Sequence, residues 1–284
     1  MVDIASVADP LAVAANTVTN VSLERVEADN ATVGTTYEML SNVDATPTFI
    51  DIVGTTAGLG IEADSASTKD DGSPAGVGAQ EVKIYGLDAN WAIQTDTITL
   101  DGTTSTTATT NKYAFVNKAE VTAAGSELDA AGIITIQSTA GTLGKIDAAQ
   151  WRMQNCVWQV PAGHTGYVHG FWYYVLPLAA PVGQCVFRLA VHHYGVMGDV
   201  SSNIQYTNIC EVTVDEGDSG VAVNEARGGY GTGYFQFPGN VPIVIPGKDI
   251  VTLQAKAMST AVAVSGGFNI MIQGTGAGTV TTDS

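Results

Sequence analysis

Hydrophobic and polar residues alternate most clearly over residues 79–103. Val82 and Ile84 are apolar and are flanked by polar or amphipathic residues, which is the period-two pattern of a β-strand with one face in solvent. Gly, Asp and Asn residues then end this strand, because they favour turns. A second strand follows, and Asp101-Gly102 after it predicts a type I′ hairpin turn. The stretch is therefore predicted to be a strand pair, and it carries no catalytic motif.

Further strand-like runs follow at short spacing and are separated by turns that contain Gly and Pro. Pro ends a strand because it cannot donate a hydrogen bond to the ladder, and Gly then turns the chain. The junctions at 160–167 and 245–250 share this pattern. The spacing predicts an all-β fold, an antiparallel β-sandwich of jelly-roll-like form, with one short helix near 147–153. The main predicted strands cover residues 37–40, 48–53, 112–121, 132–137, 155–160, 166–176, 184–191, 205–214, 241–245, 250–257 and 262–272.

A polar loop at 62–78 divides the chain into two predicted regions. Residues 1–75 form an N-terminal arm or segment with short strands, and residues 76–284 form the sandwich. Residues 1–35 hold no single hydrophobic period, which favours an arm that takes its shape from a neighbour. An ordinary first strand is the alternative.

Composition narrows the functional classes. The chain has 284 residues, and 28 acidic against 11 basic residues give a formal charge of −17. Such a chain is repelled by nucleic acid and by anionic membranes, so no nucleic-acid or membrane partner is expected. No run approaches the roughly 18 apolar residues of a membrane span. The first residues lack the basic and apolar regions of a signal peptide, so synthesis in a host cytoplasm is expected.

The cysteines and histidines predict no metal site. Three cysteines in apolar, strand-like runs are expected to be buried free thiols. The four histidines fall within one short region, but a metal needs imidazoles that converge on one point, and packed or interface histidines are the better interpretation. The residues concerned are Cys156, Cys185, Cys210, His164, His169, His192 and His193.

Other candidate chemistry is weak. The acidic loops at 69–72 and 215–220 could offer oxygen ligands to Ca²⁺, but they lack EF-hand spacing and are interpreted as solvated loops. The Gly-rich run at 228–235 has no P-loop lysine and is expected to be a flexible loop with aromatic side chains. No nucleophile elbow is present. We therefore expect no enzyme activity, no cofactor and no metal.

An aromatic run at 171–174 is the most unusual feature of the chain. On a strand, Phe171 and Tyr173 lie on one face and Trp172 and Tyr174 on the other. Core packing and a subunit interface are both open explanations for this run. The candidate interface residues, including three from the Gly-rich region, are Phe171, Trp172, Tyr173, Tyr174, Tyr230, Tyr234 and Phe235.

Several of these stretches together resemble structural proteins of tailed bacteriophages, many from marine and cyanobacterial hosts. The shared outline runs from Gly76-Val77-Gly78 through Gly86-Leu87-Asp88 to the Thr-rich turn at 101–104, and continues at 117–121 and 160–167. It covers residues 60–195, about half of the chain. The resemblance implies a virion component exposed on the particle. Proteins of this kind include trimeric jelly-roll cement proteins that bind between capsomers, and knob or fibre proteins of the tail.

The expected function is therefore that of a capsid decoration or cement protein on the outer surface of the capsid. It would stabilise capsomer junctions by burying interface area, without chemistry. Its expected partners are the major capsid protein and itself, as a homotrimer. The alternative is a tail knob or fibre protein that binds a host receptor.

Overall fold

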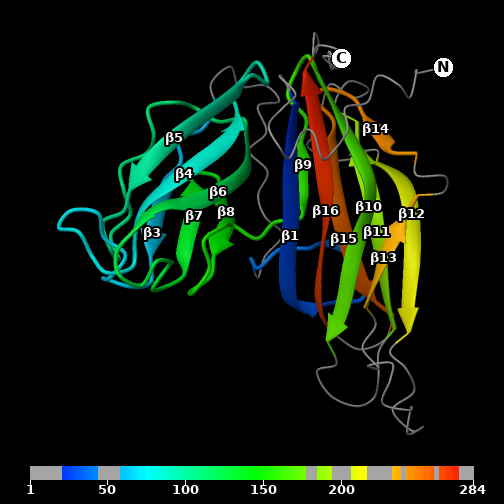
Figure 1. The fold of residues 1–284 in the computed structure, drawn as a ribbon, viewed down its shortest axis with the longest axis horizontal. Coiled ribbons are helices and arrows are strands. Elements are labelled where there is room, and N and C mark those ends of the chain that lie inside the picture. Colours follow the sequence, from blue (N-terminus) through cyan, green and yellow to red (C-terminus); the bar gives the residue numbers. More distant parts are fainter. Residues whose placement is uncertain are drawn as a thin grey trace, which may run out of the picture.

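A computed structural model describes residues 21–43, 58–176, 184–193, 206–215, 232–237, 241–258 and 262–274. Every strand pair in these ranges is antiparallel, and no helix occurs among them. The strands form two units around separate hydrophobic cores (Figure 1). The predicted all-β, antiparallel sandwich is confirmed, and the jelly-roll topology stays a prediction.

The larger unit is a sandwich of two sheets. Sheet A has the order β1-β16-β10-β13, and β14 also pairs with β10; sheet B has the order β12-β11-β15-β2, and β9 also pairs with β15. The ten strands are β1 (Val21–Val33), β2 (Glu38–Met39), β9 (Val157–Gln159), β10 (His164–Leu176), β11 (Gln184–His192), β12 (Tyr206–Asp215), β13 (Thr232–Gln236), β14 (Ile243–Ile245), β15 (Ile250–Ala257) and β16 (Val262–Gly274).

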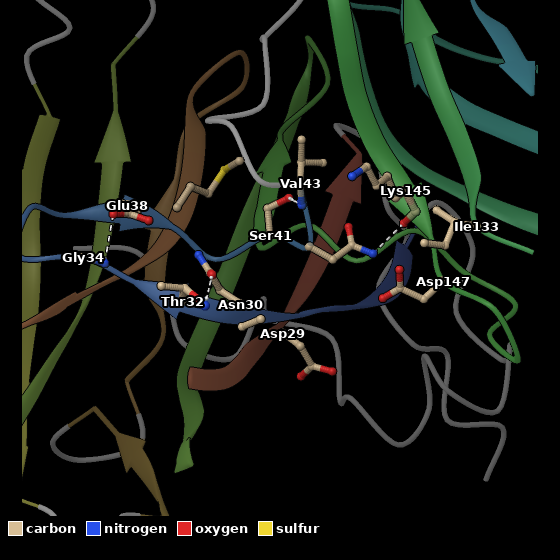
Figure 2. A pocket seen from close by; sticks show the side chains of 13 residues that line it. Asp29, Asn30, Thr32, Gly34, Glu38, Ser41, Val43, Ile133, Lys145 and Asp147 are labelled. Atoms are coloured by element: carbon tan, nitrogen blue, oxygen red, sulfur yellow. Dashed lines mark hydrogen bonds between the residues drawn. The ribbon is translucent and has the colours of Figure 1, made fainter. Parts of the chain in front are cut away.

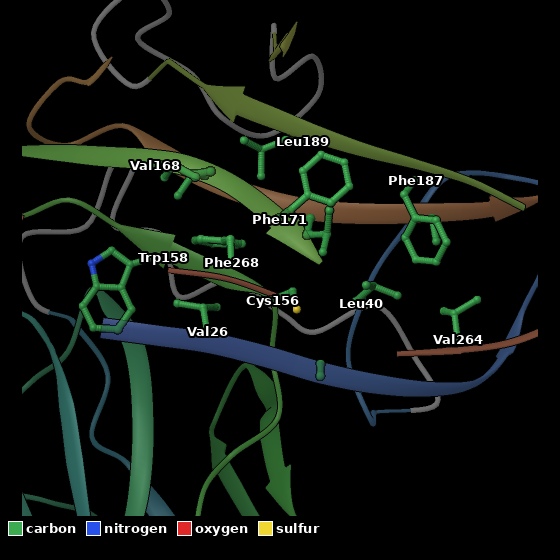
Figure 3. Packing of buried hydrophobic residues seen from close by; sticks show 14 of the residues in the cluster. Val26, Leu40, Cys156, Trp158, Val168, Phe171, Phe187, Leu189, Val264 and Phe268 are labelled. Carbon is green, nitrogen blue, oxygen red and sulfur yellow. The ribbon is translucent and has the colours of Figure 1, made fainter. Parts of the chain in front are cut away.

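The sandwich core lies between these two sheets (Figure 3). Phe171, Phe187 and Phe268 are fully buried there, and each comes from a different strand. Burying one such side chain stabilises the fold by roughly 1.5–3 kcal/mol. The register of β10 against β16 shifts between Val168 and Phe171, yet both residues reach the core. Because of this irregularity, odd-numbered residues from Phe171 onward point into the core, whereas even-numbered Val168 points into it before the shift.

The smaller unit lies between β2 and β9 in the chain. It consists of sheet C, with the order β3-β7-β8, and sheet D, with the order β5-β4-β6. Val82 and Ile84 of β4 are fully buried in its core, as the alternation at the start of the strand pair predicts. Its strands are β3 (Glu62–Ser65), β4 (Ala79–Leu87), β5 (Ile93–Thr99), β6 (Phe115–Ala124), β7 (Ile134–Ser138) and β8 (Gly141–Ile146).

The two hydrophobic cores do not follow the predicted boundary between residues 75 and 76. That position lies between β3 and β4, and both strands supply residues to the smaller core. The sandwich core takes residues from β1 and again from β9 onward. Of residues 1–35, for which an arm is predicted, 1–20 lie outside the described residues, and 21–33 form β1, the ordinary first strand that was the alternative.

Four local predictions are wrong. Residues 62–65 of the predicted polar loop form β3, and residues 232–235 of the predicted flexible loop belong to β13, because both segments pair with neighbouring strands. Residues 147–153 form turns and bends instead of a helix, because Ala149 has a left-handed φ of 60° that interrupts helical geometry. The turn after β5 is formed by residues 101–104, but only Gly102 of its two central residues has a positive φ. A type I′ turn needs a positive φ at both central residues, so this turn is of another type.

Contacts between the two units are both apolar and ionic. Leu87 and Phe115 of the smaller unit form one buried cluster with Met39 and Val157 of the sandwich. Lys118 Nζ lies 2.9 Å from a carboxylate oxygen of Glu24 on β1. A buried apolar contact flanked by a charged pair fixes the position of the smaller unit beside β1.

Candidate functional site

The aromatic run on β10 is divided between the core and the surface. Phe171 is fully buried, and its ring stacks on Phe235 of β13 with centroids 5.5 Å apart. Tyr173 packs against the same core and stacks on Phe187 at 5.2 Å. Three of the predicted interface residues, Phe171, Tyr173 and Phe235, therefore contribute to the sandwich core.

Trp172 and Tyr234 occupy the opposite face of sheet A. They are direct partners in the register of β10 and β13, and 56% of Tyr234 is exposed. The guanidinium of Arg25 on β1 lies 5.1 Å from the centre of the Trp172 ring. Tyr174 is half-buried and follows on the same face by alternation, whereas Tyr230 lies outside the described residues. These aromatic residues are available for contact with a partner in a way that Phe171 is not.

A glycine on β16 makes room for Trp172. Gly267 pairs with Trp172 in the register, and a Cβ at Gly267 would overlap the indole ring and the carbonyl oxygen of Val26. Only glycine lets the ring lie against the strand at this point. The sequence signal for this arrangement is the Gly266-Gly267 pair inside the strand predicted at 262–272.

A row of apolar side chains crosses the same face of sheet A at Met271, four residues along β16 from Gly267. Leu23, Met271, Tyr167 and Val244 are successive partners on β1, β16, β10 and β14. The neighbours of Met271 in sequence, Ile270 and Ile272, point into the core, so Met271 points outward. Met271 is 1% exposed, whereas the ends of the row, Leu23 and Val244, are 40% and 47% exposed.

We refer to Leu23, Tyr167, Trp172, Tyr234, Val244 and Met271 as the outer face of sheet A. Leu23, Tyr234 and Val244 are exposed on it, Trp172 is half-buried, and Tyr167 and Met271 are buried beneath them on a support four strands wide. Exposed apolar surface of this kind on a folded protein marks sites of contact with other molecules. The outer face of sheet A is the candidate functional site.

The histidines serve local contacts. His164 Nδ1 lies 2.9 Å from the carbonyl oxygen of Ala162, and His169 lies at the register irregularity of β10. His192 Nε2 lies 3.1 Å from the Thr252 hydroxyl, and burial together with nearby Arg188 lowers the pKa of His192 to about 4. Within the described ranges, no group of three or more His, Cys, Asp or Glu could hold a metal ion.

His193 bridges a buried carboxylate and an exposed hydroxyl. Its Nδ1 lies 2.7 Å from Asp249 Oδ2, and its Nε2 lies 3.0 Å from Thr207 Oγ1. A chain of this kind can share a proton between Thr207 and His193. It joins residues far apart in the sequence, so spacing did not reveal it. These contacts join the end of β11 to β12 and to the residue that precedes β15, so we assign them a structural role.

The acidic loop at 69–72 is not simply solvated. Asp70 is fully buried and accepts hydrogen bonds from the Ser65 hydroxyl and from the backbone N–H groups of Ala79, Ala131 and Gly132, at 2.6–2.9 Å. With its oxygens engaged in this way, Asp70 acts as a structural centre of the smaller unit and not as a Ca²⁺ ligand. The other acidic loop, 215–220, lies outside the described residues after Asp215.

The cysteines are free, as predicted. Cys156 and Cys185 are fully buried, and Cys210 is half-buried. Burial raises the pKa of the Cys156 thiol well above its usual value and raises that of Cys210 to about 11. Both shifts keep the thiols protonated near neutral pH and so disfavour nucleophilic roles.

No family model matches this chain, and no curated protein matches it in sequence. Among solved structures, it is similar to the VP2 subviral particle of infectious bursal disease virus, with 11% identity and a TM-score of 0.21 over 95% of this chain and 74% of that chain. It is also similar to a structure of the Gx strain of infectious bursal disease virus, with 9% identity and a TM-score of 0.11 over 95% of this chain and 83% of that one. At TM-scores this low, the likeness carries no argument about fold or function.

No helix in the described part of the chain is long and apolar enough to cross a membrane.

Proposed function

We propose that this protein is a structural component of a virus particle, a decoration or cement protein that binds the outer capsid surface. One observation carries the proposal: the outer face of sheet A exposes Leu23, Tyr234 and Val244 on a rigid sheet. Such a face suits permanent contact with another protein. The resemblance of residues 60–195 to structural proteins of tailed phages supports the choice of a virus particle.

The proposed partner at this face is the major capsid protein. Contact across capsomer junctions would bury Leu23, Val244 and the Trp172–Tyr234 pair, and would thereby stabilise the junction without a catalytic step. We propose a homotrimer, so that three such faces bind one particle together. Multivalent binding makes modest single contacts effectively permanent. The charge of −17 suits the outside of the particle, away from packaged nucleic acid.

A second candidate function is host recognition by a tail knob or fibre. The observation in its favour is the exposed Tyr234 beside Trp172, with Arg25 against the indole ring. Aromatic rings with a neighbouring polar group can bind a glycan by stacking and hydrogen bonding. The same face would then contact a host receptor instead of the shell.

Copy number separates the two candidates. Purified particles of the virus that encodes this protein are resolved by denaturing gel electrophoresis, and its band is quantified against the major capsid protein. A decoration protein is present in an amount close to that of the shell protein or a fixed fraction of it, such as one third. A few copies per particle indicate the tail. Absence from purified particles contradicts both candidates.

A further inference from the structure

A cleft of about 680 Å³ lies between the two units (Figure 2), and its described lining includes none of the residues of the outer face of sheet A. One wall is formed by the second half of β1 and the segment that contains β2, and it includes Asp29, Asn30 and Asn42. The other wall belongs to the smaller unit and includes Lys145 and Asp147. Clefts of 300–1,000 Å³ between structural units are common ligand sites. The size admits two or three side chains of a partner.

The lining carries more negative than positive charge. Asp29, Glu38 and Asp147 are acidic, and Lys145 is the one basic residue among those that line the cleft. No hydrogen bond or ion pair of the Asp29 or Asp147 side chain is found within the described residues. Glu38 is already engaged, because one of its carboxylate oxygens accepts a hydrogen bond from the backbone N–H of Gly34 at 3.0 Å. Asp29 and Asp147, on opposite walls, are therefore the acceptors left for a ligand.

Two side-chain donors of the lining, on Ser41 and Asn42, are engaged within the protein. The Ser41 hydroxyl donates to Asn155 Oδ1 at 2.5 Å, and Asn42 Nδ2 donates to the carbonyl oxygen of Lys145 at 3.2 Å. Asn42 Oδ1, by contrast, has no hydrogen-bond partner. Asp29, Asp147 and Asn42 Oδ1 are thus acceptors of the lining that have no donor among the described residues. A cation with several N–H groups supplies both the missing donors and the opposite charge.

We propose that this cleft binds a basic peptide segment of a partner protein, through Arg or Lys side chains that bridge Asp29 and Asp147. A metal ion fits less well, since no group of three ligating residues occurs in the described ranges. A sugar fits less well because none of the described residues that line the cleft is aromatic and could stack on it. The inference concerns the isolated protein and does not depend on the assignment to a virus particle.

The test measures fluorescence anisotropy of a labelled peptide, Gly-Arg-Gly-Arg-Gly, with the full-length protein. The double variant Asp29→Asn/Asp147→Asn is compared with Glu81→Gln/Asp101→Asn, in which neither residue lines the cleft. Each pair removes two negative charges, so both proteins go from −17 to −15 and match in overall attraction. Thermal unfolding of both variants confirms that they fold.

We expect the cleft variant to bind the peptide at least tenfold more weakly than the original protein, a loss of about 1.4 kcal/mol in binding free energy. The control variant is expected to bind within about twofold of the original protein. Binding by the original protein slows amide exchange at residues 29–34 and 145–147. Equal weakening by both variants shows bulk charge attraction and overturns the proposal. Equal binding of Gly-Gln-Gly-Gln-Gly, or no binding of the basic peptide, also overturns it.

Discussion

Trp172 on β10 lies directly opposite Tyr234 on β13, and both side chains point away from the sandwich core. The preceding pair in the same register, Phe171 and Phe235, packs into the core. One step along two strands therefore separates residues that hold the fold together from residues that a partner can reach. Substitutions at neighbouring positions should therefore differ: one at a core residue should lower stability, and one at an outward-facing residue should instead affect contact with a partner.

Phe171→Ala is expected to destabilise the sandwich by about 3–5 kcal/mol, because it removes a fully buried ring and leaves a cavity. Tyr234→Ala removes a ring that is 56% exposed, and its expected cost is about 1 kcal/mol or less. Urea unfolding followed by tryptophan fluorescence measures both. Equal destabilisation by the two substitutions would show that the register described for β10 and β13 is wrong.

Asp70→Ala is expected to destabilise the smaller unit by about 3 kcal/mol or more, because it leaves several buried N–H groups without acceptors. Asp71→Ala is the matched control, since the Asp71 carboxylate accepts one hydrogen bond within the described residues, from the N–H of Ser73. Its expected cost is about 1 kcal/mol or less. Thermal unfolding measures both variants, and a cost for Asp71→Ala that matches Asp70→Ala would refute the structural role of Asp70.

Local pattern predicted most of the strands, but not β3, β8 or β13. The alternation at Val82 and Ile84 gives a buried inner face in the structure, and Ile250–Ala257 has the predicted bounds. The alternating faces of the aromatic run were also predictable, because they follow from strand geometry alone. Which face meets the core was not predictable, since the register irregularity before Phe171 and the pairing with β13 depend on distant residues.

Long-range pairing explains the remaining differences. The smaller unit interrupts the sandwich between β2 and β9, and only the pairing of β2 and β9 with β15 reveals this. The two Pro-Gly junctions resemble each other in sequence, but their adjacency appears only in the reciprocal backbone hydrogen bonds that link Val160 with Lys248 and Asp249. The buried role of Asp70 likewise depends on donors from Ala131 and Gly132, which are about 60 residues away.

His192 is expected to make the fold less stable in acid. Its pKa is lowered to about 4 in the folded protein and is about 6.5 when unfolded, so the unfolded chain binds the proton first as pH falls. The contribution is complete above pH 6.5 and is lost between pH 6.5 and 4, up to about 3 kcal/mol. His192→Gln should reduce the pH dependence of the unfolding free energy over this interval. An unchanged dependence would contradict the assignment.

The three thiols are expected to be unreactive in the folded protein. Cys156 and Cys185 are fully buried, and the raised pKa values of Cys156 and Cys210 keep these thiols protonated at pH 8. Ellman's reagent at pH 8 should modify well under one thiol per chain over minutes, and all three in denaturant. Rapid modification of one thiol in the native protein would show that its burial is wrong.

The central claim is that the outer face of sheet A attaches the protein to a virus particle. The direct measurement is co-sedimentation of recombinant protein with particles that lack it, for the triple variant Leu23→Ser/Tyr234→Ser/Val244→Ser. A matched control, Val77→Ser/Ile93→Ser/Leu128→Ser, removes exposed apolar side chains from the smaller unit. The account predicts that the control binds as the original protein does and that the outer-face variant, although folded, stays in the supernatant. Full binding by the outer-face variant would contradict the account.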